Sequence, residues 1–216
     1  MSNIKSLLCL AALALAMVVP TAKAAGMPPT GNFVSVRVNG AHIAYGAILT
    51  NNRILVPAHV VSGVAPGNYS VLAGSTDRGV TACPTCQLRS VTRIVRHPGY
   101  NTSGGYNNDV AILYVSPLTF NATVFGSTVA APFSNAVGTQ FTQVGYENGG
   151  TNYNQLQTTA SAPWTLATMP GDVHTPGAFV RTTSNTVLHG MLTYNNPNQT
   201  QVAMKLSDYA AWINAN

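Results

Sequence analysis

Short apolar runs, rich in β-branched and aromatic residues and separated by turn residues, recur along the chain from residue 33 to residue 206. The run 33–38 nearly alternates apolar and polar side chains, which is the pattern of a half-buried strand. Asn39-Gly40 follows it, and both residue types tolerate the positive φ angles of a two-residue hairpin turn. Strands at this spacing, joined by Gly, Asn and Pro turns, predict an all-β barrel or sandwich rather than alternating strands and helices.

The segments with strand composition are Phe33–Val38, Ile43–Leu49, Ile54–Val56, Tyr69–Ala73, Val91–Arg96, Val110–Val115, Phe141–Tyr146, Leu156–Ala160, Val187–Thr193 and Val202–Leu206. A helix is expected at the end of the chain, because Leu206, Tyr209 and Ile213 recur at helical spacing. Ser207 or Asp208 can cap that helix through a side-chain oxygen. Only 7% of the residues are charged, which argues against a disordered chain.

Residues 1–24 have the pattern of a secretory signal peptide. Lys5 gives a positive start, residues 7–19 are apolar, and Ala22-Lys23-Ala24 is a small-x-small cleavage site. The apolar run is shorter than the roughly 20 residues that a membrane-spanning helix needs. The sequence therefore predicts a secreted, extracellular domain over residues 25–216 and no membrane partner.

The mature chain is mildly basic and has one cysteine pair. Without Lys5 and Lys23, eight of the 10 Lys and Arg residues remain against five Asp and Glu, which leaves a net charge of +3. No arginine-rich run is present, so no nucleic-acid partner is expected. Two residues separate Cys83 from Cys86, and in a secreted chain these cysteines are expected to form a small loop disulfide. A zinc site would need two further ligands, and no cofactor or metal is expected.

Asn-x-Ser/Thr sequences, the acceptor pattern for N-glycosylation, occur at Asn68, Asn101, Asn121 and Asn198. In a eukaryotic secreted protein they would place glycans on surface loops.

Several segments together resemble the trypsin-like serine proteases (the S1 family). They are Tyr45-Gly46-Ala47-Ile48-Leu49-Thr50, Ile54-Leu55-Val56-Pro57-Ala58-His59, Val95-Arg96-His97-Pro98-Gly99-Tyr100-Asn101, Asn108-Asp109-Val110-Ala111-Ile112-Leu113, Leu188-His189-Gly190-Met191-Leu192-Thr193-Tyr194 and Tyr209-Ala210-Ala211-Trp212-Ile213. Each is short, but their order and spacing match those of the family.

The resemblance implies two antiparallel six-stranded β-barrels with a cleft between them and a C-terminal helix. The first barrel would cover about residues 25–125, and the second, with the helix, 126–216. The second barrel would be shortened, because only six residues separate Trp164 from Gly171. His59 and Asp109 match the family's catalytic base and the carboxylate that orients it.

The segment that carries the family's nucleophile departs from its pattern. The family reads Gly-Asp-Ser-Gly-Gly-Pro, whereas this chain reads Gly171-Asp172-Val173-His174-Thr175-Pro176. Val173 stands at the nucleophile position, after the two residues Gly171 and Asp172 of the oxyanion loop. The two cysteines that bracket the family's His loop are replaced by Ala44 and Val60.

These departures lead to the expectation that the protein is not an enzyme but a secreted, inactive homologue. Such a protein would bind or inhibit an extracellular partner, either a protein such as a hydrolase or a glycan. It would be similar to the glucanase inhibitor proteins of oomycetes. The alternative is a divergent, active serine-type endopeptidase with a non-standard nucleophile. Thr175 takes that role if the register slides by two residues.

Overall fold

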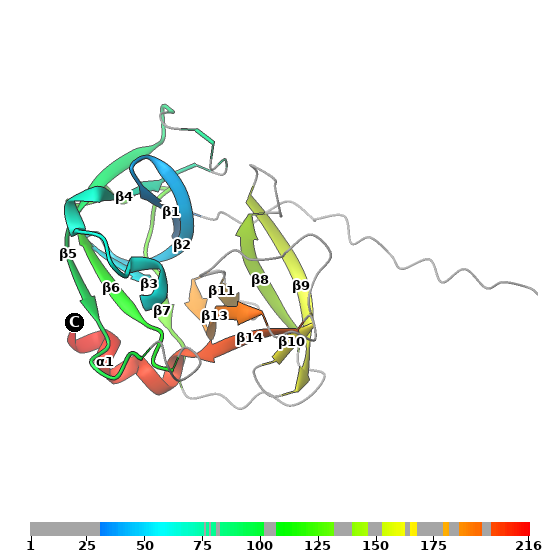
Figure 1. Cartoon of the computed structure of the whole chain (residues 1–216). Coiled ribbons are helices and arrows are strands. Elements are labelled where there is room, and N and C mark those ends of the chain that lie inside the picture. The colour runs from blue at the N-terminus through cyan, green and yellow to red at the C-terminus, as the bar shows by residue number, and fades with distance from the viewer. Residues whose placement is uncertain are drawn as a thin grey trace, which may run out of the picture.

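The computed structural model describes residues 31–75, 77, 79–80, 83–101, 107–131, 140–146, 153–162, 165–167, 179–181, 186–195 and 200–216. Two closed β-barrels lie side by side, the first in blue to green and the second in yellow to red in Figure 1. The predicted signal peptide, Gly171, Asp172, Val173, Thr175 and Asn198 lie outside the described residues.

The first barrel consists of six antiparallel strands. In the order in which they pair, these are β1 (Phe33–Val38), β2 (Ala41–Thr50), β3 (Arg53–Val56), β6 (Ala111–Val115), β5 (Gln87–Arg96) and β4 (Tyr69–Ala73), which returns to β1. Its interior is filled by apolar side chains from every strand, including Val36, Ile48, Ile54, Val71, Val91 and Leu113. Two short 3-10 helices, η1 (Ala58–Val61) and η2 (Pro66–Asn68), connect β3 to β4.

The second barrel pairs β10 (Thr165–Ala167), β14 (Thr200–Lys205), β13 (Gly190–Asn195), β11 (Phe179–Arg181), β8 (Gln140–Tyr146) and β9 (Tyr153–Ala162). Outside the barrels, β7 (Thr128–Val129) and β12 (Val187–Leu188) pair in parallel. Through this pairing, the segment that follows the first barrel contacts the segment that precedes β13 of the second barrel.

A second hydrophobic core joins the two barrels. Side chains from the first barrel, such as Tyr45, Leu55 and Ile112, pack with Val144, Leu188, Met191, Leu192 and Ala203 of the second. Burying an aliphatic side chain of this size contributes roughly 1.5–3 kcal/mol. The relative position of the two barrels is therefore set by apolar packing.

The chain ends on the outside of the first barrel, where α1 (Ala210–Ala215) lies beside β5 and β6 in Figure 1. Ile213 is buried in the core between the barrels, and the Arg53 guanidinium donates to its backbone carbonyl. The Tyr114 hydroxyl donates to the Asn216 carbonyl, and the Arg93 guanidinium lies 3.7 Å from the centre of the Tyr114 ring. Two arginines of the first barrel therefore help to hold the last helix in place.

The predicted fold class is confirmed: the protein is mostly β, with closed six-stranded barrels and a short C-terminal helix. The hairpin turn is also confirmed, because Asn39 and Gly40 have φ angles of 50° and 84°. The predicted strands missed the short elements β7, β10 and β11, which have only two or three residues each. So short a segment carries too little periodicity to stand out from a loop.

The predicted helix cap is wrong. Ser207 and Asp208 lie inside a 3-10 turn, η4 (Leu206–Tyr209), and α1 begins at Ala210 after Tyr209, which makes no side-chain cap hydrogen bond. Asp208 instead pairs with Lys205 at 3.1 Å. Of the helices in the described part of the chain, none is long and apolar enough to cross a membrane.

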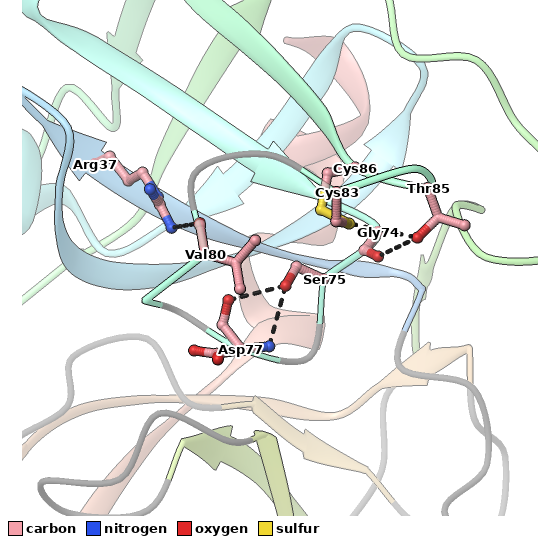
Figure 2. The surroundings of a disulfide bond; sticks show 8 residues. All are labelled: Arg37, Gly74, Ser75, Asp77, Val80, Cys83, Thr85 and Cys86. Carbon is pink, nitrogen blue, oxygen red and sulfur yellow. Dashed lines mark hydrogen bonds between the residues drawn. A yellow bond between two sulfur atoms is a disulfide. The ribbon is translucent and has the colours of Figure 1, made fainter.

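Cys83 and Cys86 form the predicted disulfide, in the loop between β4 and β5 (Figure 2). The Thr85 hydroxyl in this loop donates to the Gly74 carbonyl at 3.2 Å, and the Arg37 guanidinium donates to the Val80 carbonyl at 2.7 Å. Gly74 has a φ of 78°, and a Cβ added to it would collide with the Thr85 carbonyl. The loop therefore closes against a position that requires glycine.

We expect Gly74→Ala to lower the free energy of unfolding by about 2–4 kcal/mol, because it adds a backbone collision to the strain of a positive φ. Gly63→Ala is the matched control. Gly63 has a φ of 80° but has open space around its Cα, so its cost should be about 1–2 kcal/mol. Urea unfolding measures both, and equal losses would mean that the Thr85 contact contributes nothing.

Candidate active site

His59 lies on η1, immediately after β3 leaves the first barrel. Ala58, directly before His59, and Val61, two residues after it, are fully buried in the barrel core. These apolar anchors fix the backbone of η1 against the end of the barrel. The His59 side chain is half-buried, with 20% of its surface exposed.

Asp109 lies in the turn that enters β6. Asn108 before it has a φ of 55°, a left-handed conformation that asparagine tolerates better than most residues. The Asn108 side-chain amide donates to the Gly99 carbonyl at 2.8 Å, and the His97 N–H donates to the Val110 carbonyl at 2.9 Å. This turn points the Asp109 carboxylate inward, where it has no exposed surface.

The structure brings His59 and Asp109 together through two hydrogen bonds. His59 Nδ1 lies 2.7 Å from Asp109 Oδ2, and the His59 backbone N–H donates to Asp109 Oδ1 at 2.8 Å. An ionised carboxylate only accepts hydrogen bonds, so this contact places the ring hydrogen on Nδ1. His59 Nε2 is then the basic nitrogen, which is the tautomer that a general base needs.

Tyr209 supports this turn from the C-terminal segment, and the sequence analysis missed that role. Burial raises the pKa of Tyr209, the charge on Asp208 adds to the rise, and a hydrogen bond with the Asn108 backbone opposes it. His97 makes edge contacts with the rings of Tyr209 and Trp212, at 5.6 Å and 5.1 Å between centroids. Aromatic side chains of the C-terminal segment, Tyr209 in η4 and Trp212 in α1, therefore brace the loop that holds Asp109.

The remaining predicted site residues fall into two groups. Gly171, Asp172, Val173 and Thr175 lie outside the described residues, so their roles stay predictions. Three of the predicted glycosylation sites, Asn68, Asn101 and Asn121, are exposed, and their use also stays a prediction. In the described part of the chain no three His, Cys, Asp or Glu residues are grouped to hold a metal. The expectation that the protein has no cofactor stays a prediction.

Residues 26–171 match the family model for trypsin. The chain belongs to the trypsin family. The match includes His59 and Asp109 and covers most of the two barrels described above.

Curated relatives of this trypsin-family chain include insect proteins that are named as trypsins or as a protease. Trypsin zeta from Drosophila erecta is 36% identical over 76 residues, which are 35% of this chain and 26% of the relative. Trypsin zeta from Drosophila melanogaster is 38% identical over 80 residues, with the same shares. Vitellin-degrading protease from Bombyx mori is 32% identical over 92 residues, which are 42% of this chain and 33% of the relative. The matched stretches thus span between a quarter and a third of each relative.

Solved structures share the fold over a longer stretch. A mutant of human heparin binding protein superimposes with a TM-score of 0.76, covering 88% of this chain and 93% of that one, at 14% identity. The heparin binding protein at atomic resolution gives a TM-score of 0.74 over the same shares. At this identity the likeness concerns the fold alone.

The prediction that the protein is not an enzyme is wrong. The relatives that it matches are named as trypsins, which are enzymes, and nothing in the family match indicates a loss of activity. That prediction depended on several departures from the family's sequence, above all on Val173, which lies in a segment outside the described residues. It gave that side chain more weight than the intact pair of His59 and Asp109.

His189, between β12 and β13, gives the protein a testable pH dependence. Burial lowers the pKa of His189 from its ordinary value of 6.5. The unfolded chain therefore takes up this proton at a higher pH than the folded chain, so the free energy of unfolding falls as the pH drops from about 7 through 6.5. We expect a smaller loss between pH 7.5 and 5.5 in His189→Gln than in the wild type, measured by urea unfolding. The same loss in both proteins would contradict the assignment.

Proposed function

We propose that the mature chain is a secreted endopeptidase that cleaves peptide bonds by acyl transfer, with His59 as the general base. The observation that carries this proposal is the geometry of His59 and Asp109. Their two hydrogen bonds are 2.7 and 2.8 Å long, and the carboxylate is fully buried. Membership of the trypsin family supports it.

In this proposal each group has one role. Asp109 holds the Nδ1 hydrogen of His59, so that Nε2 can take the proton of an attacking hydroxyl as its oxygen bonds to the substrate carbonyl carbon. His59 then gives that proton to the departing amine as the C–N bond breaks. A water molecule, activated by the same nitrogen, cleaves the resulting ester and frees the hydroxyl.

Thr175 is the proposed nucleophile. Val173 has no oxygen and cannot form the ester, whereas Thr175 is a hydroxyl residue two positions later in the same segment. A threonine hydroxyl needs an adjacent base to attack a carbonyl, and His59 would supply it. The backbone amides of the loop that begins with Gly171 and Asp172 would stabilise the oxyanion.

Secretion is supported by the signal-like residues 1–24 and by the disulfide between Cys83 and Cys86, since such bonds persist in oxidising compartments. The substrate would then be an extracellular polypeptide. Binding to an extracellular hydrolase or to a glycan stays a prediction from the sequence.

Labelling with a fluorophosphonate tests the nucleophile. We expect the wild-type mature protein to gain the mass of one adduct, because His59 activates a hydroxyl that attacks phosphorus. His59→Ala and Thr175→Val should remove the adduct, and intact mass spectrometry reads all the proteins. Val173→Ala is the matched control in the same segment and should still be labelled. A wild-type protein that gains no mass would contradict the endopeptidase, and an adduct on Thr175→Val would contradict Thr175 as its nucleophile.

Asp109→Asn separates catalysis from folding. Asparagine keeps the shape of the side chain but can donate to His59 Nδ1, which favours the wrong ring tautomer. The equivalent change in a well-studied member of the family lowers kcat about 10⁴-fold, and the size of the effect expected here is taken from that enzyme. We expect a loss of that order in peptide hydrolysis, with a thermal unfolding midpoint close to that of the wild type. Wild-type kcat in the Asp109→Asn protein would show that the pair has no catalytic role.

A further inference from the structure

The C-terminal end of η1, just after His59, is held by two side chains from other strands. The Arg96 guanidinium donates to the Val61 carbonyl at 2.5 Å, and the Tyr69 hydroxyl lies 3.5 Å from the Val60 carbonyl. The last carbonyls of a helix have no partner within the helix, so they accept hydrogen bonds from elsewhere. Here the donors come from β5 and β4.

Arg96 also belongs to the strand pair that positions Asp109. It is the last residue of β5 and pairs with Ala111, the first residue of β6 and two positions after Asp109. The next residue, His97, donates its N–H to the Val110 carbonyl at 2.9 Å. The backbone of Arg96 is thus fixed to the strand that follows Asp109, while its side chain reaches the helix that carries His59.

Tyr69 and Arg96 lie close enough to act as one unit. Burial raises the pKa of Tyr69, and the positive charge of Arg96 is the opposing influence. Because burial is the larger effect, the hydroxyl keeps its hydrogen at neutral pH and remains a donor. The Tyr69 ring is buried in the first barrel, so it supplies a rigid contact beside the longer arginine.

The resemblance to the family explains why η1 would need this support. Ala44 and Val60 stand where the family has the cysteines that bracket its His loop. Ala44 is fully buried, and Val60 packs on the same barrel core. The two cysteines in the described part of the chain are bonded to each other at the far loop, so no disulfide ties η1 to β2.

We propose that Arg96 is a positioning residue that takes over the task of the missing disulfide and holds η1, and with it the His59 ring, in place at the end of the barrel. The inference rests on the proposed peptidase function for its kinetic consequence, but its structural part can be tested without activity. Loss of Arg96 frees one end of η1 while the Asp109 contacts remain, so His59 Nε2 shifts relative to the reacting atoms. Displacing a catalytic group by about 1 Å can cost roughly 100-fold in rate.

The test compares Arg96→Ala, Arg96→Lys and Arg89→Ala in the full mature chain. Arg89 is the matched control, because it also lies on β5 and donates from its side chain to a backbone carbonyl, that of Pro117 at 2.8 Å, away from η1. Two measurements are made on each protein. One is kcat and KM for a fluorogenic peptide, and the other is the Cε1–H NMR resonance of the His59 ring, assigned by its loss in His59→Gln.

We expect Arg96→Ala to lower kcat by roughly 10- to 100-fold with KM within about twofold, and to shift and broaden the His59 resonance. Arg96→Lys should recover most of kcat, because lysine keeps a charged donor at this position. Arg89→Ala should match the wild type in both measurements.

Unchanged kcat and an unchanged resonance in Arg96→Ala would overturn the proposal, and so would equal losses in Arg89→Ala. If the wild type cleaves no peptide, the proposed function fails, and the resonance alone decides on Arg96. If Arg96→Ala does not fold, Arg96→Met, which keeps a long side chain but has no donor, is compared with Arg89→Met, and equal effects would again overturn the proposal.

Discussion

The burial of the Asp109 carboxylate is the constraint on which the rest of this site depends. A carboxylate with no exposed surface must be matched by hydrogen bonds, because an unpaired charge in a protein interior costs several kcal/mol. His59 supplies two of these bonds, through its ring and through its own backbone N–H. The backbone contact matters as much as the ring contact, since it fixes η1 itself and not only a rotatable side chain. The left-handed conformation of Asn108 and its bond to the Gly99 carbonyl then hold the carboxylate from the other side.

Both barrels and the last helix converge on this point. Val110, next to Asp109, is buried in the core between the barrels, where Leu188, Met191 and Ile213 also lie. Tyr209 approaches the Asn108 backbone from the C-terminal segment. The site is therefore supported by residues from distant parts of the chain. A substitution in the final helix can therefore disturb the position of Asp109 without contacting His59.

The fold could be predicted from the sequence wherever a local pattern was strong enough. β1 and β4 were predicted to the residue, because alternation and turn residues mark both ends of each strand. The Asn39-Gly40 turn could be predicted from its two residues alone, and the Cys83–Cys86 disulfide from the four residues of its motif. The short strands β10 and β11 could not be found, since their pairing depends on neighbours far away along the chain. The bond from Arg96 to Val61 was hidden for the same reason, because Val61 and Arg96 are 35 positions apart in the sequence.

The expectation of an inactive protein failed because of how it weighed two kinds of evidence. One was a set of departures from the family's sequence, chiefly the lack of a side-chain oxygen at Val173, in a segment that aligns with the family in two ways. The other was a pair whose geometry is specified by strands, turns and a buried carboxylate. A buried carboxylate with its hydrogen-bond partners is a poor source of stability, because well-packed apolar residues of similar volume avoid the cost of removing a charge from water. The stability of the fold therefore does not require this arrangement, and under the proposed function it would serve proton transfer at His59 Nε2. In that proposal His59 Nε2 is already in place, and the identity of the hydroxyl that approaches it decides the mechanism.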